Sequence, residues 1–516
     1  MPYQKIEVNS PAGIIKDQSP TDIPLNAWSD GVNVLFNNGK ATKALGHLQV
    51  FGTPSGNPYW SFPVIENDIL TWFYATDTKI YKYSGATHID VTRLSGNYNF
   101  DIEVGWNGGT LNGLPVANNG NDIPQIIEAA DSTFKDMPNW PATLRSKIIR
   151  PFKNYLVALN LVESSTELEH SLRWSSPADP GFAPPSWDIA DPTEQAGQTS
   201  LSDSGGRIVD GVPLKDQFII YKEDAVYSMR FIGGLPVFQF RKIFSDIGAV
   251  STHCISEYEG KHFVVGTGDI YIHDGINKQS VVDAKMRDFF FSTVDNTYFS
   301  RVHTVVDRLR TEIWVCYPNK DSVDGKCNLA LIWNWSDNTW TIRQLPDTYY
   351  AASGVVDPDD SLPTDLWDNS IGAWNTDVSV WNEGSYNPAK QKVMLLSPWD
   401  TKIFIVDQTS LFDGQSFLSI LERSGIDFED PRSIKYINSV APQVTGAGVL
   451  DVYVGSQMIE GEGVEWKGPF PYEIGQDYKI DCRVSGRFIA IKFQSGSSAN
   501  WNINGYTMEI TTTGED

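Results

Sequence analysis

The sequence predicts an all-β protein with an irregular β-propeller at its core. Three observations lead to this prediction. Aromatic residues make up 12% of the 516 positions, and aromatic side chains fit the half-buried surface of a pleated sheet. A unit of two strands joined by a turn recurs along the chain in degenerate form. Few segments show the 3.6-residue periodicity of an amphipathic helix.

The recurring unit is an apolar strand, a polar turn and a second strand that carries Tyr or Phe. Copies begin at Ile69, Asn154, Phe218, Phe263, Glu312 and Met394. A lone hairpin cannot bury both faces, so each copy must stack on its neighbours. Tyr227 and Tyr271 are 271 − 227 = 44 positions apart, close to one propeller blade of roughly 40–50 residues. Other intervals are longer, so inserted loops are expected, and a stacked sandwich is the competing arrangement.

The chain divides into three parts on this reading. Residues 1–50 carry turn signals with little periodicity and are expected to form an extended N-terminal arm that lies on another part of the protein. Residues 51–410 hold the repeated hairpins and form the propeller, with inserted loops notably at 175–212 and 357–390. Residues 411–516 form an additional C-terminal β domain.

Two local patterns predict further elements. The best helical signal is the short segment 122–136, "DIPQIIEAADSTFKD". In "DYKIDCRV", alternation places Tyr478, Ile480 and Cys482 on one face of a strand.

The chain is acidic, and this restricts its partners. It has 40 Lys and Arg against 64 Asp and Glu, a net charge of −24. The acids are dispersed, so most of the surface repels nucleic acid and anionic lipid, and DNA binding by phosphate neutralisation is disfavoured. No apolar run reaches the ~18 residues of a membrane span, and the N-terminus lacks the apolar segment of a secretory signal.

Known motifs predict no catalytic, cofactor-binding or metal site. The patterns GxxxxGK[ST], HExxH and GxSxG are absent. Residues 319–325 resemble a calcium loop without its alternating oxygen ligands, so a hairpin turn is expected. His262 and His273 fall on neighbouring predicted strands, and we interpret them as hydrogen-bonded strand residues. The four cysteines are expected to be buried free thiols. A pair of catalytic carboxylates among the 64 acids stays open.

Three tryptophans stand seven positions apart, at Trp367, Trp374 and Trp381. That spacing would give one helical stripe, but the surrounding Gly, Asn and Val residues oppose a helix. The rings could stack on sugars, or they could pack against the propeller or a neighbouring subunit. Because tryptophan is enriched at interfaces, we favour packing. The subunit-interface candidates are Trp28, Trp367, Trp374 and Trp381.

A family resemblance is carried by the segment Gly13–His47, "GIIKDQSPTDIPLNAWSDGVNVLFNNGKATKALGH". It resembles the N-terminal signature of tail nozzle proteins of short-tailed bacteriophages, also called tail tubular B or packaged-DNA stabilisation proteins. Later stretches, such as "LRWSSPADP", "ALIWNWSDNTWTIRQLP" and "WNINGYTMEI", are similar to the same family and follow in order. Leu35 departs from the basic residue expected there. The matching residues of the signature are Gly13, Ile14, Asp17, Leu25, Trp28, Asp30, Asn33, Val34, Phe36, Gly39 and Gly46.

The resemblance implies a structural virion protein rather than an enzyme, without a cofactor. In that family an irregular propeller with added β domains forms a hexameric ring in the phage tail, assembled in the host cytoplasm. The ring lies below the portal and its adaptor ring, retains packaged DNA, and offers docking surfaces for fibres, spikes or a distal plug or needle. DNA would pass without specific binding.

Charge agrees with a conduit for DNA. Six copies would carry 6 × −24 = −144 charges, so acids are expected to outnumber bases on the channel wall. The alternatives are a β-propeller adhesin that binds a glycan and a polysaccharide depolymerase.

Overall fold

The computed structural model describes residues 4–66, 69–84, 86–191, 193–234, 236–356, 391–496 and 499–513. Nearly every element in these ranges is a β-strand, which confirms the all-β prediction. The helices described are α1 (Arg287–Thr293) and the 3-10 helix η1 (Asn296–Arg301). No helix in the described ranges has the length and apolarity needed to cross a membrane.

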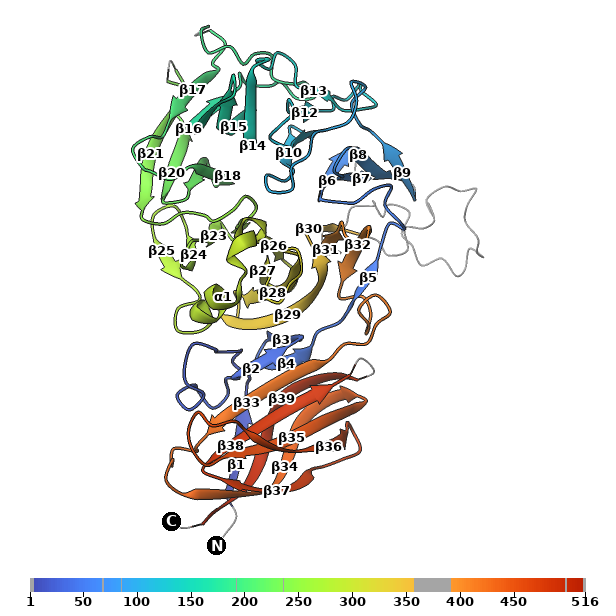
Figure 1. Ribbon diagram of the computed structural model, residues 1–516, viewed down its shortest axis with the longest axis vertical. Coiled ribbons are helices and arrows are strands. Elements are labelled where there is room, and N and C mark those ends of the chain that lie inside the picture. Colours follow the sequence, from blue (N-terminus) through green and yellow to red (C-terminus); the bar gives the residue numbers. More distant parts are fainter. Residues whose placement is uncertain are drawn as a thin grey trace.

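Within the described residues, seven four-stranded antiparallel sheets are arranged in a ring (Figure 1). The first strand of each sheet contacts the first strand of the next, and β30 in turn contacts β6. This is the order of the blades in a β-propeller. The sheets consist of β6 (Trp60–Glu66), β7 (Ile69–Ala75), β8 (Ile80–Ser84) and β9 (Thr87–Asp90); β10 (Asn107–Leu111), β11 (Leu114–Asn118), β12 (Gln125–Ile126) and β13 (Lys135–Asp136); β14 (Leu144–Phe152), β15 (Tyr155–Glu163), β16 (Thr166–Trp174) and β17 (Gly197–Ser200); β18 (Ile208–Leu214), β19 (Gln217–Lys222), β20 (Ala225–Phe231) and β21 (Phe238–Ser245); β22 (Ile255–Tyr258), β23 (Lys261–Val265), β24 (Ile270–His273) and β25 (Lys278–Ser280); β26 (His303–Asp307), β27 (Glu312–Tyr317), β28 (Cys327–Asn334) and β29 (Thr339–Thr348); β30 (Tyr350–Val355), β31 (Gln391–Ser397), β32 (Lys402–Val406) and β5 (His47–Gln49).

A β-sandwich adjoins the ring and holds the C-terminal part of the chain (Figure 1). Its two sheets share one buried core, which continues into the fourth, fifth and sixth sheets of the ring. One sheet contains β1 (Gln4–Asn9), β3 (Val34–Asn37), β4 (Lys40–Lys43), β34 (Ile434–Ala447), β37 (Ile480–Gly486) and β39 (Asn500–Thr513). The other contains β2 (Asp30–Val32), β33 (Ser419–Ile426), β35 (Val449–Gln457), β36 (Glu465–Glu473) and β38 (Phe488–Ser495).

The N-terminal segment joins the sandwich to the ring. It lies on other parts of the chain through five short strands. Strands β1 to β4 belong to the sandwich, and β5 completes the seventh sheet of the ring by pairing with β32. Two residues of the turns between β1 and β3 bind the ring: the backbone N–H of Ile14 donates to Trp340 O, and that of Asn33 donates to Ile342 O, both at 2.9 Å. Strand β29 therefore holds the segment from the side of the ring.

The six predicted hairpins are all present, because their alternating patterns are local. They are β7–β8, β15–β16, β19–β20, β23–β24, β27–β28 and β31–β32. The turn expected at 319–325 joins β27 to β28. Ile480 and Cys482 share the buried face of β37 as predicted, whereas Tyr478 precedes the strand and is 73% exposed.

The helix predicted over 122–136 is wrong. Residues in this range form β12 and β13 instead, and Ile126 pairs with Val116 in the sheet. Ile126 is fully buried there, so tertiary pairing outweighs the weak intrinsic preference of a short helix. Of the loop expected at 175–212, the part from 197 on supplies β17 and the start of β18. The loop expected at 357–390 lies outside the described residues.

Gly46, directly before β5, packs closely against the backbone of Leu411. A Cβ on Gly46 would lie 1.8 Å from the carbonyl oxygen of Leu411. Gly46→Ala must displace backbone and should lower the free energy of unfolding by about 1–3 kcal/mol, measured by urea unfolding. The control is Gly463→Ala, because no atom lies within 4 Å of its Cβ. Equal midpoints for the two variants would contradict this close approach.

Candidate functional site at the ring axis

Polar side chains from several sheets meet where the first strands of the ring converge. Arg150 on β14 forms a two-point ion pair with Asp210 on β18, with Nε–Oδ1 and Nη2–Oδ2 both 2.9 Å. Arg150 Nη1 also donates to Gly108 O on β10 at 3.1 Å. Burial alone would raise the pKa of Asp210, but the charge and hydrogen bonds of Arg150 hold it below its usual value. The pair is therefore ionised.

Two histidines and a tyrosine extend this group, and we call the five residues Arg150, Asp210, His253, His303 and Tyr350 the axial cluster. His253 N donates to Asp210 Oδ2 at 3.1 Å. The Tyr350 ring meets His253 edge-on and stacks on His303, at centroid distances of 5.0 and 5.9 Å. Burial lowers the pKa of both histidines to about 4, so both are neutral at pH 7.

A cavity of about 340 Å³ adjoins the axial cluster and shares Tyr350 with it. It opens between β6, β22, β26 and β30. Its lining combines hydroxyl groups with small apolar side chains, and the one charged side chain in it is that of Arg308. The lining residues are Ser61, Phe62, Pro63, Ser256, Thr304, Val305, Val306, Arg308, Tyr350, Ala351, Ala352, Ser353 and Gln391.

The hydroxyls of this axial cavity differ in their hydrogen bonding. Thr304 Oγ1 donates to His253 O at 3.2 Å, so in the 2.8 Å contact between Ser256 and Thr304 the serine is the donor. Ser61 and Ser353 have buried Oγ atoms without a hydrogen-bond partner among the described residues. Arg308 pairs with Glu257 at 3.3 Å, and both side chains are exposed. The unpartnered Ser61 and Ser353 hydroxyls are thus enclosed by the protein, while Ser256, Thr304 and Arg308 already have partners.

A second buried charged group lies close to the joint with the sandwich. Asp407 bridges Arg343 at 2.9 Å and Arg310 at 3.3 Å. Glu312 is nearby and accepts a 3.0 Å hydrogen bond from Trp314 Nε1. Burial raises the pKa of the Glu312 carboxyl to about 8, so this carboxyl is protonated at neutral pH. Protonation leaves a lone carboxylate, Asp407, between the two arginines.

His262 and His273 are neighbours across β23 and β24, as predicted. Tyr221 lies between them, with its hydroxyl 2.7 Å from His262 Nδ1 and 2.5 Å from His273 Nε2. His262 Nε2 contacts Pro213 O and His273 Nδ1 accepts from Gly275 N, so each ring has one donor and one acceptor in use. The interpretation as hydrogen-bonded strand residues is confirmed, and the pair joins two neighbouring sheets.

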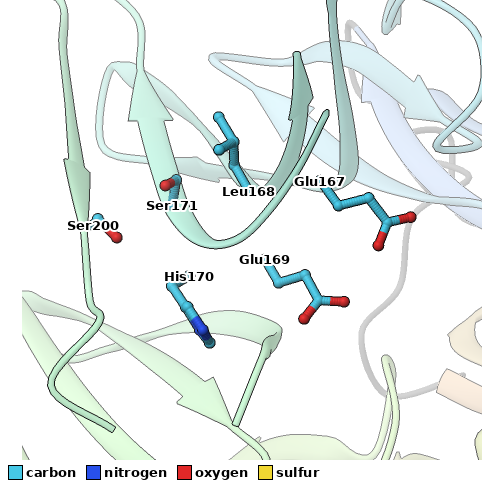
Figure 2. A pocket seen from close by; sticks show the side chains of 6 residues that line it. All are labelled: Glu167, Leu168, Glu169, His170, Ser171 and Ser200. Carbon is cyan, nitrogen blue, oxygen red and sulfur yellow. The ribbon is translucent and has the colours of Figure 1, made fainter. Parts of the chain in front are cut away.

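The other hollow of note lies at the outer edge of β16 and β17. It measures about 430 Å³ and is lined by Glu167, Leu168, Glu169, His170, Ser171 and Ser200. Figure 2 shows the two glutamates extending to one side and His170 in another direction. In the described ranges, no three His, Cys, Asp or Glu side chains are grouped as metal ligands. All four cysteines are free and buried, as predicted.

Of the predicted interface tryptophans, Trp28 lies within the described ranges. Trp28 is 2% exposed. Its ring packs on Phe493 and Tyr506 of the same chain, at centroid distances of 5.9 and 6.1 Å. Trp28 therefore stabilises the sandwich of its own chain, which corrects its assignment as an interface residue. Trp367, Trp374 and Trp381 lie outside the described residues.

Comparison with known proteins adds little to this description. No family model matches the chain, and no curated protein matches it. Among solved structures, the AfRom2 CNH domain matches at 8% sequence identity over 71% of this chain and 97% of that chain, with a TM-score of 0.36. A TM-score this low carries no argument about function.

The axial ion pair should be sensitive to removal of one partner. Arg150→Met leaves the Asp210 charge buried and unpaired, and should lower the free energy of unfolding by about 3–5 kcal/mol. Adding Asp210→Asn should recover part of that loss, because the unpaired charge is removed. Arg207→Met, which breaks an exposed pair with Glu223, is the control and should cost about 1 kcal/mol or less. A double variant no more stable than Arg150→Met would contradict this account.

Glu312 should give the chain a defined pH dependence. Between its usual pKa of 4.5 and its folded pKa of about 8, the carboxyl is protonated when folded and ionised when unfolded. Folding then takes up a proton, so the stability from this group falls as the pH rises through that window. Over this window, the free energy of unfolding of Glu312→Gln, measured with urea, should rise relative to that of the wild type by up to about 1.4 kcal/mol per pH unit. A difference in stability that stays constant with pH would show that Glu312 is ionised when folded.

Proposed function

We propose that the chain is a tail nozzle protein of a short-tailed bacteriophage. It would be a structural subunit of a hexameric ring that continues the DNA-ejection channel below the adaptor and portal. In this role it retains packaged DNA and presents surfaces to fibres, spikes or a plug, and it performs no catalysis. The observation that carries the proposal is the position of the residues that make up the nozzle signature.

Those signature residues occupy positions where the geometry restricts the residue type. Gly13 has φ +89°, and a Cβ there would lie 2.9 Å from Thr339 Cβ. Asn33 is fully buried at φ +59° and its side chain bonds Gln344 and Leu418 O. Asp17 accepts hydrogen bonds from two backbone N–H groups at the start of α1. The signature residues therefore lie where the ring contacts the sandwich. This supports the proposal that the chain shares the architecture of the nozzle proteins.

The axial cluster bears on where DNA would pass. Arg150 and Asp210 pair between the first strands of two neighbouring sheets, so we place the DNA channel outside the single-chain ring. In the proposed assembly the channel lies between six copies, with a total formal charge of 6 × −24 = −144. An acid-rich wall offers few cations to hold phosphates, which favours passage of DNA over binding.

Oligomeric state tests the nozzle proposal. Mass photometry of the purified chain, followed by electron microscopy, should show rings of 6 × 57.5 = 345 kDa with a central opening. Acidic side chains should outnumber basic ones on the wall of that opening. A chain that stays monomeric at micromolar concentration, or rings with a wall of mainly Lys and Arg, would contradict the proposal.

A further inference from the structure

We propose that the outer edge of β16 binds an extended segment of a partner protein that carries Lys or Arg at alternate positions. The segment adds a strand to the third sheet of the ring, in line with β17. We call this strand position the edge slot. It lies beside residues 166–170, beyond the end of β17, at the hollow of about 430 Å³. The slot belongs to one chain, so the inference does not depend on the assembly of six copies.

The first argument is the unequal length of the two outer strands of this sheet. Strand β16 has nine residues, but β17 pairs with the last four of them alone. One further hydrogen bond, from Leu201 N to His170 O at 2.8 Å, ends the ladder. In the next sheet, by contrast, β21 pairs along the whole of β20. About half of an outer strand position is therefore empty in the part of the chain that the structure describes.

The second argument is that the empty half leaves backbone groups available. On its inner side β16 pairs with β15, from Thr166 opposite Glu163 to Leu168 opposite Leu161. In an antiparallel pair, alternate residues direct their N–H and C=O groups away from the partner strand. Residues 166–169 therefore present such groups at the outer edge, where no strand of the described ranges pairs with them. An edge of this kind is a template for an added strand.

The third argument is the pattern of side chains along the slot. Leu168 packs against the buried core between the second and third sheets, and strand alternation places Glu167 and Glu169 on the opposite face. Figure 2 shows both glutamates extending away from Leu168. The lining contains these two carboxylates and neither Lys nor Arg. Because opposite charges across two strands stabilise their pairing, the added strand should place basic residues beside the glutamates and a small apolar residue beside Leu168.

Charge also identifies the occupant as a different protein. Two copies of this chain that paired through their β16 edges would bring the acidic side chains of both edges together, and like charges across two strands oppose pairing. The whole chain has a net charge of −24, so a basic segment is attracted to it over a longer range as well.

Binding of short peptides to the full chain tests the inference. The probe is the peptide GTKVKVKTG with blocked ends and a fluorescent label, followed by anisotropy at low salt, where exposed charges are least screened. The double variant Glu167→Gln/Glu169→Gln should weaken its Kd about fivefold, since two cross-strand charge pairs are lost. The matched control Glu462→Gln/Glu465→Gln removes two exposed acids of the sandwich, and should bind as the wild type does.

Two measurements on the wild type separate strand addition from general attraction of a cation to an acidic chain. A peptide of the same sequence with N-methylated amides keeps its charge but cannot donate backbone hydrogen bonds, so it should not bind. Hydrogen exchange of residues 166–170 should slow when the unmethylated peptide binds.

The melting temperature of each variant reports whether the fold persists. Ring formation is measured separately, so a failure of this inference is distinguishable from a failure of the nozzle proposal. The assignment is overturned if the wild type does not bind the peptide, if the two double variants bind it equally, if the methylated peptide binds as well as the unmethylated one, or if exchange at 166–170 is unchanged.

Discussion

The ring and the sandwich both depend on pairing between residues near the two ends of the chain. Strand β5 pairs with β32, which follows it by about 350 positions, and β1 and β4 pair with β39. Closing such long loops costs conformational entropy that only burial and hydrogen bonding across the joint can offset. The continuous core between the sandwich and three sheets of the ring supplies that burial. Residues 4–49 therefore act as a structural clamp between the two parts.

The hairpins of this architecture could be predicted from the sequence. Hairpins such as β7–β8 and β23–β24 were predictable because strand alternation and turn residues are read over a few positions. The pairing of His262 with His273 followed from the same local pattern. The helix predicted at 122–136 was wrong because a contact outside the segment decides its structure. Ile126 pairs with Val116 of the neighbouring strand. Trp28 was assigned to an interface because its type is common there, while its actual neighbours lie more than 460 positions away.

The axial cluster could not be predicted from the sequence. Its members come from different parts of the ring: Arg150, Asp210, His303 and Tyr350 lie on the first strands of four sheets, and His253 lies in the turn before β22. Only the order of the sheets brings them together. The same holds for Glu312, whose carboxyl is protonated because burial among other acids disfavours its charge. Although the chain is acidic, the buried ionisable groups of the axial cluster are either ion-paired or neutral, and Glu312 is neutral.

The central claim is that the N-terminal clamp makes ring and sandwich a single cooperative unit. Hydrogen exchange followed by mass spectrometry tests it most directly, because it reports the opening free energy of each strand. The account predicts that peptides from β5, β32, β33 and β39 share one slow exchange rate, set by unfolding of the whole chain. Exchange of the sandwich strands well before those of the ring would show that the sandwich opens by itself, and would contradict the claim.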